Sequence, residues 1–313
     1  MQLTQFTQDD GKKYGKELIM VQQFLNNTGL FTDEALAEML DKHPSHLIDF
    51  QHIPDNPDYK DQQVTVDFSG ADGKTMIEAA KSSSKIWINV REVMNRQPEY
   101  KKVLDQIHKE MEKATGRNKD RRNCRGGVLI SSASAATPYH VDPTITHLWH
   151  IRGHKKAWVY PRTPEFLPDE DFERVILGEV DEDMPFESAF DKQAIFAGDL
   201  MGGELVAWPH RSPHRVENVT YCISMVMEFS TRKSAFTNAG MLANGVLRRK
   251  YGRTPSWVNA SAPEKVVKAA LGRVLHNIGM RKQFRRKDMV KYKLDTTVKG
   301  FVRAVATPYE RVH

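Results

Sequence analysis

The clearest indication of the fold is the stretch TPYHVDPTITHLWHIRGHKKAWVYP, residues 137–161. It contains three short β-type runs, PYHVD, THLWHI and KKAWVYP, that are separated by turn residues. His140 and Asp142 lie two positions apart in the first run, so on a strand both side chains point to the same face. One strand can therefore offer an imidazole and a carboxylate to a single metal ion.

Runs of the same kind extend on both sides of this stretch, from residue 126 to residue 231. GVLISS precedes it, and QAIFAG, ELVAWP, HRVENV and YCISMVMEF follow it. Many short strands with regular turn residues are typical of a β-sandwich or barrel. An acidic stretch, residues 165–191, divides the set into two halves, and we expect it to be an insertion at the surface.

Helical patterns flank this β region. Residues 14–42 and 97–115 predict helices, and QVTVDF and KIWINV between them predict strands. After Ser230 the pattern is helical again, and residues 263–280 are amphipathic. The sequence thus predicts three regions: residues 1–124, helices and strands that pack on the core; residues 125–231, the β core with its acidic insertion; and residues 232–313, a helical, basic C-terminal extension.

The composition is that of a globular protein, with 313 residues, 40% of them hydrophobic and 27% charged. No segment is apolar and long enough to cross a bilayer, and the first residues, MQLTQFTQDDGKKYGK, lack the apolar run of a secretory signal. The two cysteines, Cys124 and Cys222, are too few for a disulfide framework or a zinc knuckle. We therefore expect a cytoplasmic protein, one that can also attach to the membrane surface.

The net charge of +6 is unevenly distributed along the chain. RKQFRRKDMVKYK, residues 281–293, is strongly basic and follows the amphipathic segment 263–280. Such a pair can meet an anionic membrane surface or nucleic acid. A basic run is equally common as a solvated surface segment, so charge alone does not decide.

A third metal ligand must come from another segment, and six of the twelve histidines are candidates to be weighed. His108 and Glu110 form a second pair two residues apart, but they lie on a predicted helix, where such residues do not face each other. The other three histidines are on the next strand or its turn, where we expect them to line the site or support it rather than ligate. These are His147, His150 and His154.

The remaining candidates, His210 and His214, lie in GELVAWPHRSPHRVENV, residues 203–219. His210 is within the loop, whereas His214 opens the strand that follows, so we favour His214. Two histidines and one carboxylate on one triangular face of an ion leave open positions opposite, which a non-haem Fe(II) oxygenase requires. A histidine and aspartate two apart are common by chance, so the pair gains weight only from its surroundings.

Residues 137–161 together with GELVAWPHRSPHRV resemble the cupin-like, JmjC-type Fe(II)/2-oxoglutarate oxygenases. The shared pattern is threonine-proline-x-histidine-x-aspartate, then glycine-x-lysine and a run that ends in proline, then an apolar run, a proline and a histidine five residues later. Gly203-Glu204 stands where the family has glycine-aspartate. The resemblance covers about residues 126–231 and implies a mainly β core, a double-stranded β-helix or jelly roll, with flanking helices.

The resemblance also assigns site residues. It implies His140, Asp142 and His214 as iron ligands, with 2-oxoglutarate and O2 as the other participants. Lys155 falls on the lysine that pairs with the distal carboxylate of 2-oxoglutarate, and Thr137 on the threonine that bonds the same carboxylate.

Three further residues complete this assignment. Thr146 stands near the co-substrate, where relatives often carry asparagine. Lys156 and Arg215 are neighbours of site residues, and on a strand their side chains should point to the opposite face.

The resemblance implies hydroxylation of an unactivated C–H group, but the sequence says less about the substrate. The amphipathic and basic segments favour a lipid-linked glycan such as a Kdo-type sugar. A protein- or RNA-modifying hydroxylase of the JmjC type and a non-catalytic metal-binding cupin are the alternatives.

Overall fold

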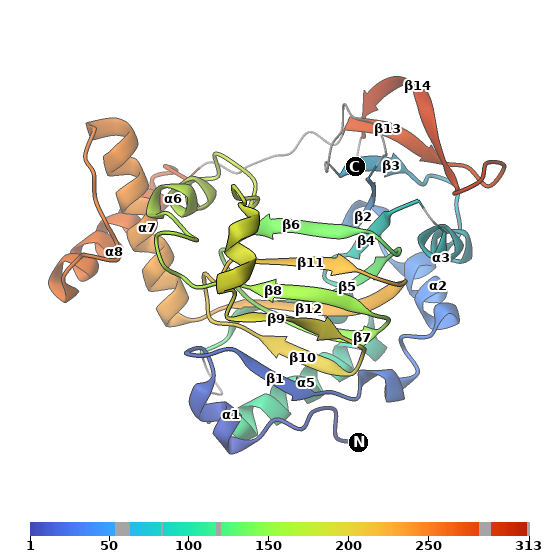
Figure 1. The fold of residues 1–313 in the computed structure, drawn as a ribbon, viewed down its shortest axis with the longest axis horizontal. Coiled ribbons are helices and arrows are strands. Elements are labelled where there is room, and N and C mark those ends of the chain that lie inside the picture. Colours follow the sequence, from blue (N-terminus) through green and yellow to red (C-terminus); the bar gives the residue numbers. More distant parts are fainter. Residues whose placement is uncertain (54–62, 83, 117–119, 282–288, 312–313) are drawn as a thin grey trace.

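The computed structural model describes residues 1–53, 63–82, 84–116, 120–281 and 289–311, and their strands form two sheets (Figure 1). The large sheet has ten strands in the order β1-β10-β7-β12-β5-β4-β2-β3-β13-β14, and the small sheet has four in the order β6-β11-β8-β9. The strands are β1 Ile19–Gln22, β2 Ile48–His52, β3 Val64–Asp67, β4 Ile86–Val90, β5 Arg122–Ser131, β6 Ala136–His140, β7 Ile145–Arg152, β8 Lys155–Val159, β9 Phe196–Leu200, β10 Glu204–Ala207, β11 His214–Asn218, β12 Cys222–Ser230, β13 Met289–Leu294 and β14 Val302–Glu310.

The eight strands from β5 to β12 build the part of the fold that holds the candidate site. Strands β5, β7, β10 and β12 are neighbours in the large sheet, and β6, β8, β9 and β11 make up the small sheet. The chain therefore passes repeatedly from one sheet to the other. A buried apolar cluster with members from β7, β8, β9 and β10 lies between the sheets: Leu148, Ala157, Val159, Leu200, Val206 and Trp208.

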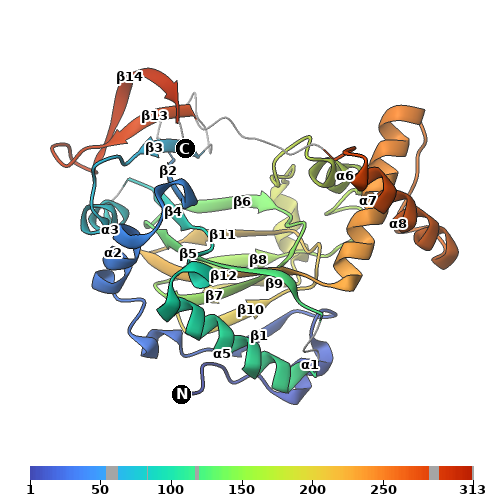
Figure 2. The same ribbon diagram turned by 180° about the vertical axis from the view of Figure 1, so that it is seen from behind.

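Helices cover the outer face of the large sheet, as Figure 2 shows for α5. α5 begins with a proline at its first position, ends at Gly116 in the left-handed conformation, and buries Val103, Leu104 and Ile107 on one face. This spacing of three and four residues explains why the segment is helical. The helices are α1 Gln8–Lys13, α2 Asp33–Lys42, α3 Gly73–Lys81, α4 Val93–Arg96, α5 Pro98–Thr115, α6 Asp169–Leu177, α7 Arg232–Tyr251 and α8 Ala262–Asn277, with 3-10 turns at Leu25–Thr28, Ser45–Leu47 and Ser188–Gln193.

Helices α6, α7 and α8 gather beyond one end of the two sheets (Figure 1). The acidic stretch 165–191 includes α6, which was expected to lie in a surface insertion. Instead α6 buries Phe172, Ile176 and Leu177 in a core that it shares with α7. The acidic residues of this stretch are thus interspersed with apolar residues, and the apolar residues anchor the stretch in that core.

Two predicted segments differ in the structure. Residues 14–42 were expected to be helical, and α2 is, with Thr32 as its N-cap. Residues Ile19–Gln22, however, form the edge strand β1, because buried and exposed side chains alternate there and β10 supplies a pairing partner. The sequence predicts a helical, basic extension over residues 232–313; α7 and α8 are helices, but Met289–Leu294 and Val302–Glu310 are strands, and the first pairs in parallel with β3.

The prediction of a mainly β core with helices before and after it is confirmed. The basic run 281–293 falls largely outside the described residues. α8 leaves an apolar face exposed that includes Val267, Val274 and Ile278. Among the helices of the described part, none is apolar enough over a sufficient length to span a bilayer.

Candidate metal centre

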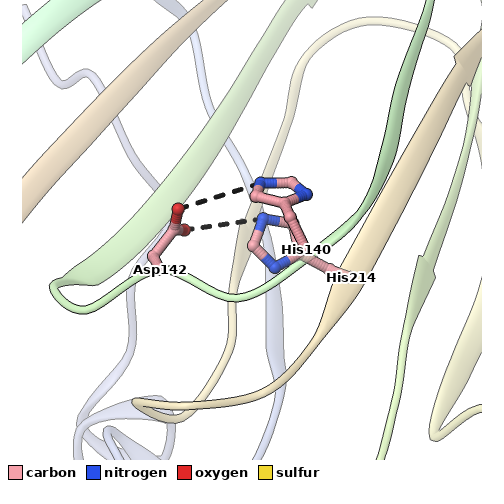
Figure 3. A group of neighbouring side chains, drawn as sticks. All are labelled: His140, Asp142 and His214. Atoms are coloured by element: carbon pink, nitrogen blue, oxygen red, sulfur yellow. Dashed lines mark ion pairs between the residues drawn. The ribbon is translucent and has the colours of Figure 1, made fainter. Parts of the chain in front are cut away.

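The structure brings His140, Asp142 and His214 together between the two sheets (Figure 3). His140 is the last residue of β6 and His214 the first residue of β11, and the two are directly paired in the antiparallel register. Asp142 follows in the loop after β6. The site therefore depends on one strand pair and one short loop, and a slip of one residue would turn a ligand away.

The distances suit one shared ion. Nε2 of His140 lies 3.8 Å from Oδ1 of Asp142, and Nε2 of His214 lies 3.5 Å from Oδ2 of Asp142. The three candidate ligand atoms all lie within 4.8 Å of one another. Ligand atoms about 2.1 Å from a common ion are separated by about 3.0–3.5 Å in octahedral or tetrahedral geometry, so only small side-chain adjustments are needed.

Backbone carbonyls fix the tautomers of both imidazoles. Nδ1 of His140 donates to the carbonyl of Pro138 at 2.8 Å, and Nδ1 of His214 donates to the carbonyl of Ser212 at 3.2 Å. A carbonyl can only accept, so the proton of each neutral ring is on Nδ1 and the lone pair is on Nε2. Both lone pairs then face the carboxylate of Asp142, as in metal sites where the other ring nitrogen of each ligand histidine donates to a carbonyl.

This arrangement needs a cation. Oδ2 of Asp142 is buried and has no hydrogen-bond partner among the described residues. Burial, followed by the neighbouring His140, lowers the pKa of His214 to about 3, so the His214 imidazole is neutral at neutral pH and supplies no positive charge. Two nitrogen lone pairs and a carboxylate that face one another are compatible with a divalent metal ion between them.

A cavity of about 440 Å³ opens beside the three residues. Thr137 of β6 and Thr146 of β7, both predicted to contact the co-substrate, line it. The hydroxyl of Thr146 is buried and has no hydrogen-bond partner among the residues that the structure describes. Trp208 also lines the cavity, with its ring centroid 4.3 Å from that of His214.

Lys155 does not line this cavity; it lies one step deeper between the sheets. On β12 the side chains of Val226 and Ser224 both point to the space between the sheets, because residues two apart on a strand share a face. Val226 lines the cavity, and Ser224 accepts a hydrogen bond of 2.8 Å from Nζ of Lys155. Lys155 therefore lies beyond the inner end of the cavity, about 7 Å further along the strand.

Lys155 is buried without a carboxylate partner in the described part of the chain. Burial lowers the pKa of its ammonium group to about 8. A buried cation without a counter-ion is unfavourable unless an anion joins it. Its surroundings thus fit the distal carboxylate of a dicarboxylic acid that reaches inward from the metal.

Lys156 and Arg215 point away from the cavity, as predicted. Lys156 is exposed on the opposite face of β8. Arg215 pairs with Asp191 at 2.7 Å and lies over the ring of Trp158. Neither side chain is available to a ligand at the metal site.

The other histidines are distributed elsewhere. His147 faces the helix-covered core, where Tyr14 and Phe229 pack against it, and His154 pairs with a surface aspartate. His150 faces inward but contacts Ser224. None of the three belongs to the cluster of candidate ligands among the described residues, and none lines the metal cavity, so the prediction that they line the site is wrong.

His210 and the pair His108 and Glu110, the alternatives that the sequence did not favour, also lie apart from the cluster of candidate ligands. His210 donates to the carbonyl of Pro143 at 3.1 Å and lines a different cavity. His108 contacts Cys124, and Glu110 accepts hydrogen bonds from the chain near the N-terminus.

Carboxylates around the cavity are the functional feature that the sequence did not indicate. Residues 181–184 run beside β6: the N–H of Val141 bonds the carbonyl of Glu182, and the N–H of Met184 bonds that of Tyr139. Only their acidic composition was visible in the sequence, because a pairing between two distant segments has no local signal. Besides Asp142, the lining carboxylates are Asp49, Asp181, Glu182, Asp183 and Glu228, and no lysine or arginine of the described chain lines the cavity.

These carboxylates affect one another. Burial and the adjacent Asp142 raise the pKa of Glu182 well above its ordinary value. Burial and Asp142 also raise the pKa of Glu228, although Arg125 pairs with it at 2.9 Å. Such shifts arise where like charges face a common space, and a bound cation would relieve them.

No family model matches the chain, and no curated protein matches it in sequence. Solved structures with a similar arrangement include the ribosomal oxygenase YcfD from Escherichia coli, with 15% identity and a TM-score of 0.48 over 91% of this chain and 70% of that one. A complex of the same Escherichia coli protein with cobalt and 2-oxoglutarate shows 14% identity and a TM-score of 0.48 over 90% and 69%. What this chain does must therefore be inferred from its own residues.

Proposed function

We propose that the protein is an Fe(II)/2-oxoglutarate-dependent oxygenase whose core, β5 to β12, is a double-stranded β-helix. The strand order supports the fold, since consecutive strands alternate between a β10-β7-β12-β5 layer and a β6-β11-β8-β9 layer, except that β8 and β9 are paired neighbours within the second layer. The observation that carries the activity is the metal centre. The lone pairs on Nε2 of His140 and of His214 face the two carboxylate oxygens of Asp142, and the oxygen that faces His214, Oδ2, is buried with no hydrogen-bond partner among the described residues.

The residues present fit each part of this activity. His140, Asp142 and His214 would hold Fe(II) on one face and leave the positions toward the cavity open. Lys155 would hold the far carboxylate of 2-oxoglutarate. With O2, the bound iron and co-substrate supply the oxidising power that hydroxylates a C–H group.

The protein's own contribution is to orient the co-substrate and keep water away from it. Leu148, Val216 and Val226 line the cavity between the metal ligands and Lys155 with apolar surface. Thr146 offers a hydroxyl that no other described group uses. An apolar wall with a cation at its end favours a ligand that is chelating at one end and anionic at the other.

The charge of the cavity supports a cationic substrate group, such as an arginine or lysine side chain of a protein. Six carboxylates of the described residues line it, Asp142 included. Although Arg91 and Arg125 pair with Asp49 and Glu228, the lining as a whole favours a positive group near the metal. The same charge opposes the lipid-linked Kdo-type glycan, because that sugar carries a carboxylate. It equally opposes RNA, whose backbone is anionic.

Succinate formation tests the activity. Purified protein with Fe(II), ascorbate, O2 and 2-oxoglutarate is expected to form succinate. A fraction of basic proteins should accelerate succinate formation, and mass spectrometry should show that a protein of this fraction has gained one oxygen atom. Lipid and RNA fractions serve as comparisons. A protein that binds the metal but forms no succinate with any fraction would favour the non-catalytic cupin instead.

A further inference from the structure

A second cavity, of about 580 Å³, lies on the other side of the loop that follows Asp142. His210 lines it and donates to the carbonyl of Pro143 in that loop. No described residue lines both cavities. The walls of the second cavity come from the chain after α1, the start of β5, the loops after β8 and β10, and the start of α7. It is therefore a separate site.

Positive side chains dominate this lining, in contrast with the metal cavity. Asp120 is the one carboxylate of the described lining, and it accepts the N–H of Arg232 at 2.9 Å. The cations come from five separate segments, so the fold rather than a local run gathers them. They are Lys16, Arg121, Arg162, Arg211 and Lys233.

Two of the cations are anchored by acidic partners but keep unused donors. Arg121 pairs with Glu112 at 3.0 Å, and Arg211 pairs with Asp169 at 3.4 Å. Their side chains are only 7% and 10% exposed, and Nη1 of Arg121 and Nε of Arg211 have no hydrogen-bond partner among the described residues. Buried guanidinium groups with unused donors are unfavourable unless a ligand or water bonds them.

Among the residues that the structure describes, the other three cations have no acidic partner. Within the described ranges, Lys16, Arg162 and Lys233 form no ion pair. Three like charges around one cavity repel each other, and an anion in the cavity would relieve that repulsion.

The start of α7 adds a partial positive charge to this cavity. This helix has 20 residues, and its capping residue Thr231 lines the cavity together with Ser234 and Thr237. The N-terminal end of a helix carries a partial positive charge. Asp120 offsets part of it here, because it accepts the N–H of Arg232, and the hydroxyls of Thr231 and Ser234 bond within a capping box. The five cations and the unused donors of the two arginines therefore account for the positive character of this cavity.

We infer that this cavity binds a phosphate-bearing small molecule. A phosphate group has up to two negative charges and several acceptor oxygens, which match three uncompensated cations and the planar donors of two arginines. The volume lies within the range of small-ligand sites, about 300–1,000 Å³. The site does not depend on the oxygenase activity, because no metal ligand lines it.

Calorimetric titration of the full chain at low ionic strength tests the inference, with inorganic phosphate and adenosine monophosphate as separate probes. Both are expected to bind, and Arg162→Ala and Lys233→Ala are each expected to weaken binding about tenfold, the loss of one charge-assisted contact. Both residues are exposed, so neither substitution should affect folding. Equal affinity of the two probes would assign the site to phosphate alone, and tighter binding of the nucleotide would add its organic part to the contacts.

Lys156→Ala is the matched control, since Lys156 is an exposed lysine outside both cavities. It should leave phosphate affinity unchanged, and Arg162→Ala should leave metal affinity unchanged. Failure of both probes to bind, equal binding by wild type and both variants, or binding of an RNA oligonucleotide but neither probe would overturn the inference.

Discussion

The two cavities of this protein have similar volumes, about 440 and 580 Å³, but opposite charge. Six carboxylates line the metal cavity, whereas five cations and one carboxylate line the cavity at the start of α7. The loop after Asp142 separates them, with its Pro143 carbonyl bound by His210 and Asn238. A net charge of +6 describes neither surface, so the chemistry of each site comes from how the fold distributes charge.

Removal of a metal ligand should have the largest effect and should act on one cavity alone. Asp142→Ala leaves two imidazoles without their shared carboxylate. Formation of succinate from 2-oxoglutarate is expected to fall by more than the roughly 100-fold that loss of a supporting residue can cause. His210→Ala is the control and should retain activity, because His210 faces the other cavity. Equal losses in both variants would contradict the assignment of ligands.

The buried lysine should make stability depend on pH. Burial lowers the pKa of Lys155 from 10.5 to about 8, so between these values the unfolded chain binds more protons and stability rises with pH. Below pH 8 the full destabilisation, on the order of 3 kcal/mol, is present. Lys155→Met should therefore stabilise the protein without co-substrate at pH 7, and the gain should shrink toward pH 10. Urea denaturation at several pH values measures it.

Other groups near Lys155 should not obscure this dependence at pH 8. Burial lowers the pKa of His150 to about 3, and burial raises the pKa of Cys222. At pH 8 the His150 imidazole and the Cys222 thiol are therefore neutral. If Lys155→Met stabilises the protein equally at pH 7 and pH 10, the titration of Lys155 is not the source of the pH dependence.

The same lysine should determine how much 2-oxoglutarate is required. Lys155→Ala removes the cation at the inner end of the metal cavity, so the half-saturating concentration of 2-oxoglutarate is expected to rise about 10- to 100-fold, with a smaller change in the maximal rate. Steady-state kinetics with Lys156→Ala as the control measures this. An unchanged requirement would mean that another group holds the distal carboxylate.

The carboxylates at the metal cavity should distinguish basic from acidic peptides. Asp181→Asn with Asp183→Asn is expected to weaken binding of a short arginine-containing peptide several-fold, and added salt should reduce the difference. Glu187→Gln, an exposed change in the same acidic stretch but outside the cavity, is the matched control. If an acidic peptide binds as well as the basic one, the charge of the cavity does not select the substrate.

The smallest effect is expected from Thr146. Its hydroxyl has no partner in the described residues, so Thr146→Val should leave the free energy of unfolding within about 1 kcal/mol of the wild type. The half-saturating concentration of 2-oxoglutarate should rise only a few-fold. A large loss of stability would show that the hydroxyl has a structural role.

The sequence was sufficient for the parts of the site that depend on local spacing. The spacing of His140 and Asp142 predicts that both meet one ion, and His214 is favoured because it opens a strand, although Asp142 itself lies in the loop just after β6. The helix α5 followed from its apolar spacing. In each case the neighbouring residues along the chain contain the information.

Features that depend on pairing between distant segments could not be predicted. Ile19–Gln22 was taken for helix because its strand partner, β10, lies far along the chain. The acidic segment was taken for a surface insertion, although Glu182 lies beside β6 and lines the metal cavity. The basic cavity also joins five separate segments, and no local pattern indicates it.

Metal stoichiometry tests most directly whether His140, Asp142 and His214 form an iron site. Protein freed of metal is titrated with Fe(II) without oxygen, and with Co(II) as a spectroscopic substitute, in the presence of 2-oxoglutarate. One ion per chain is expected for the wild type and for His210→Ala, with binding lost in His140→Ala and in His214→Ala. Absence of binding in the wild type, or equal binding by all four proteins, would contradict the proposed metal centre.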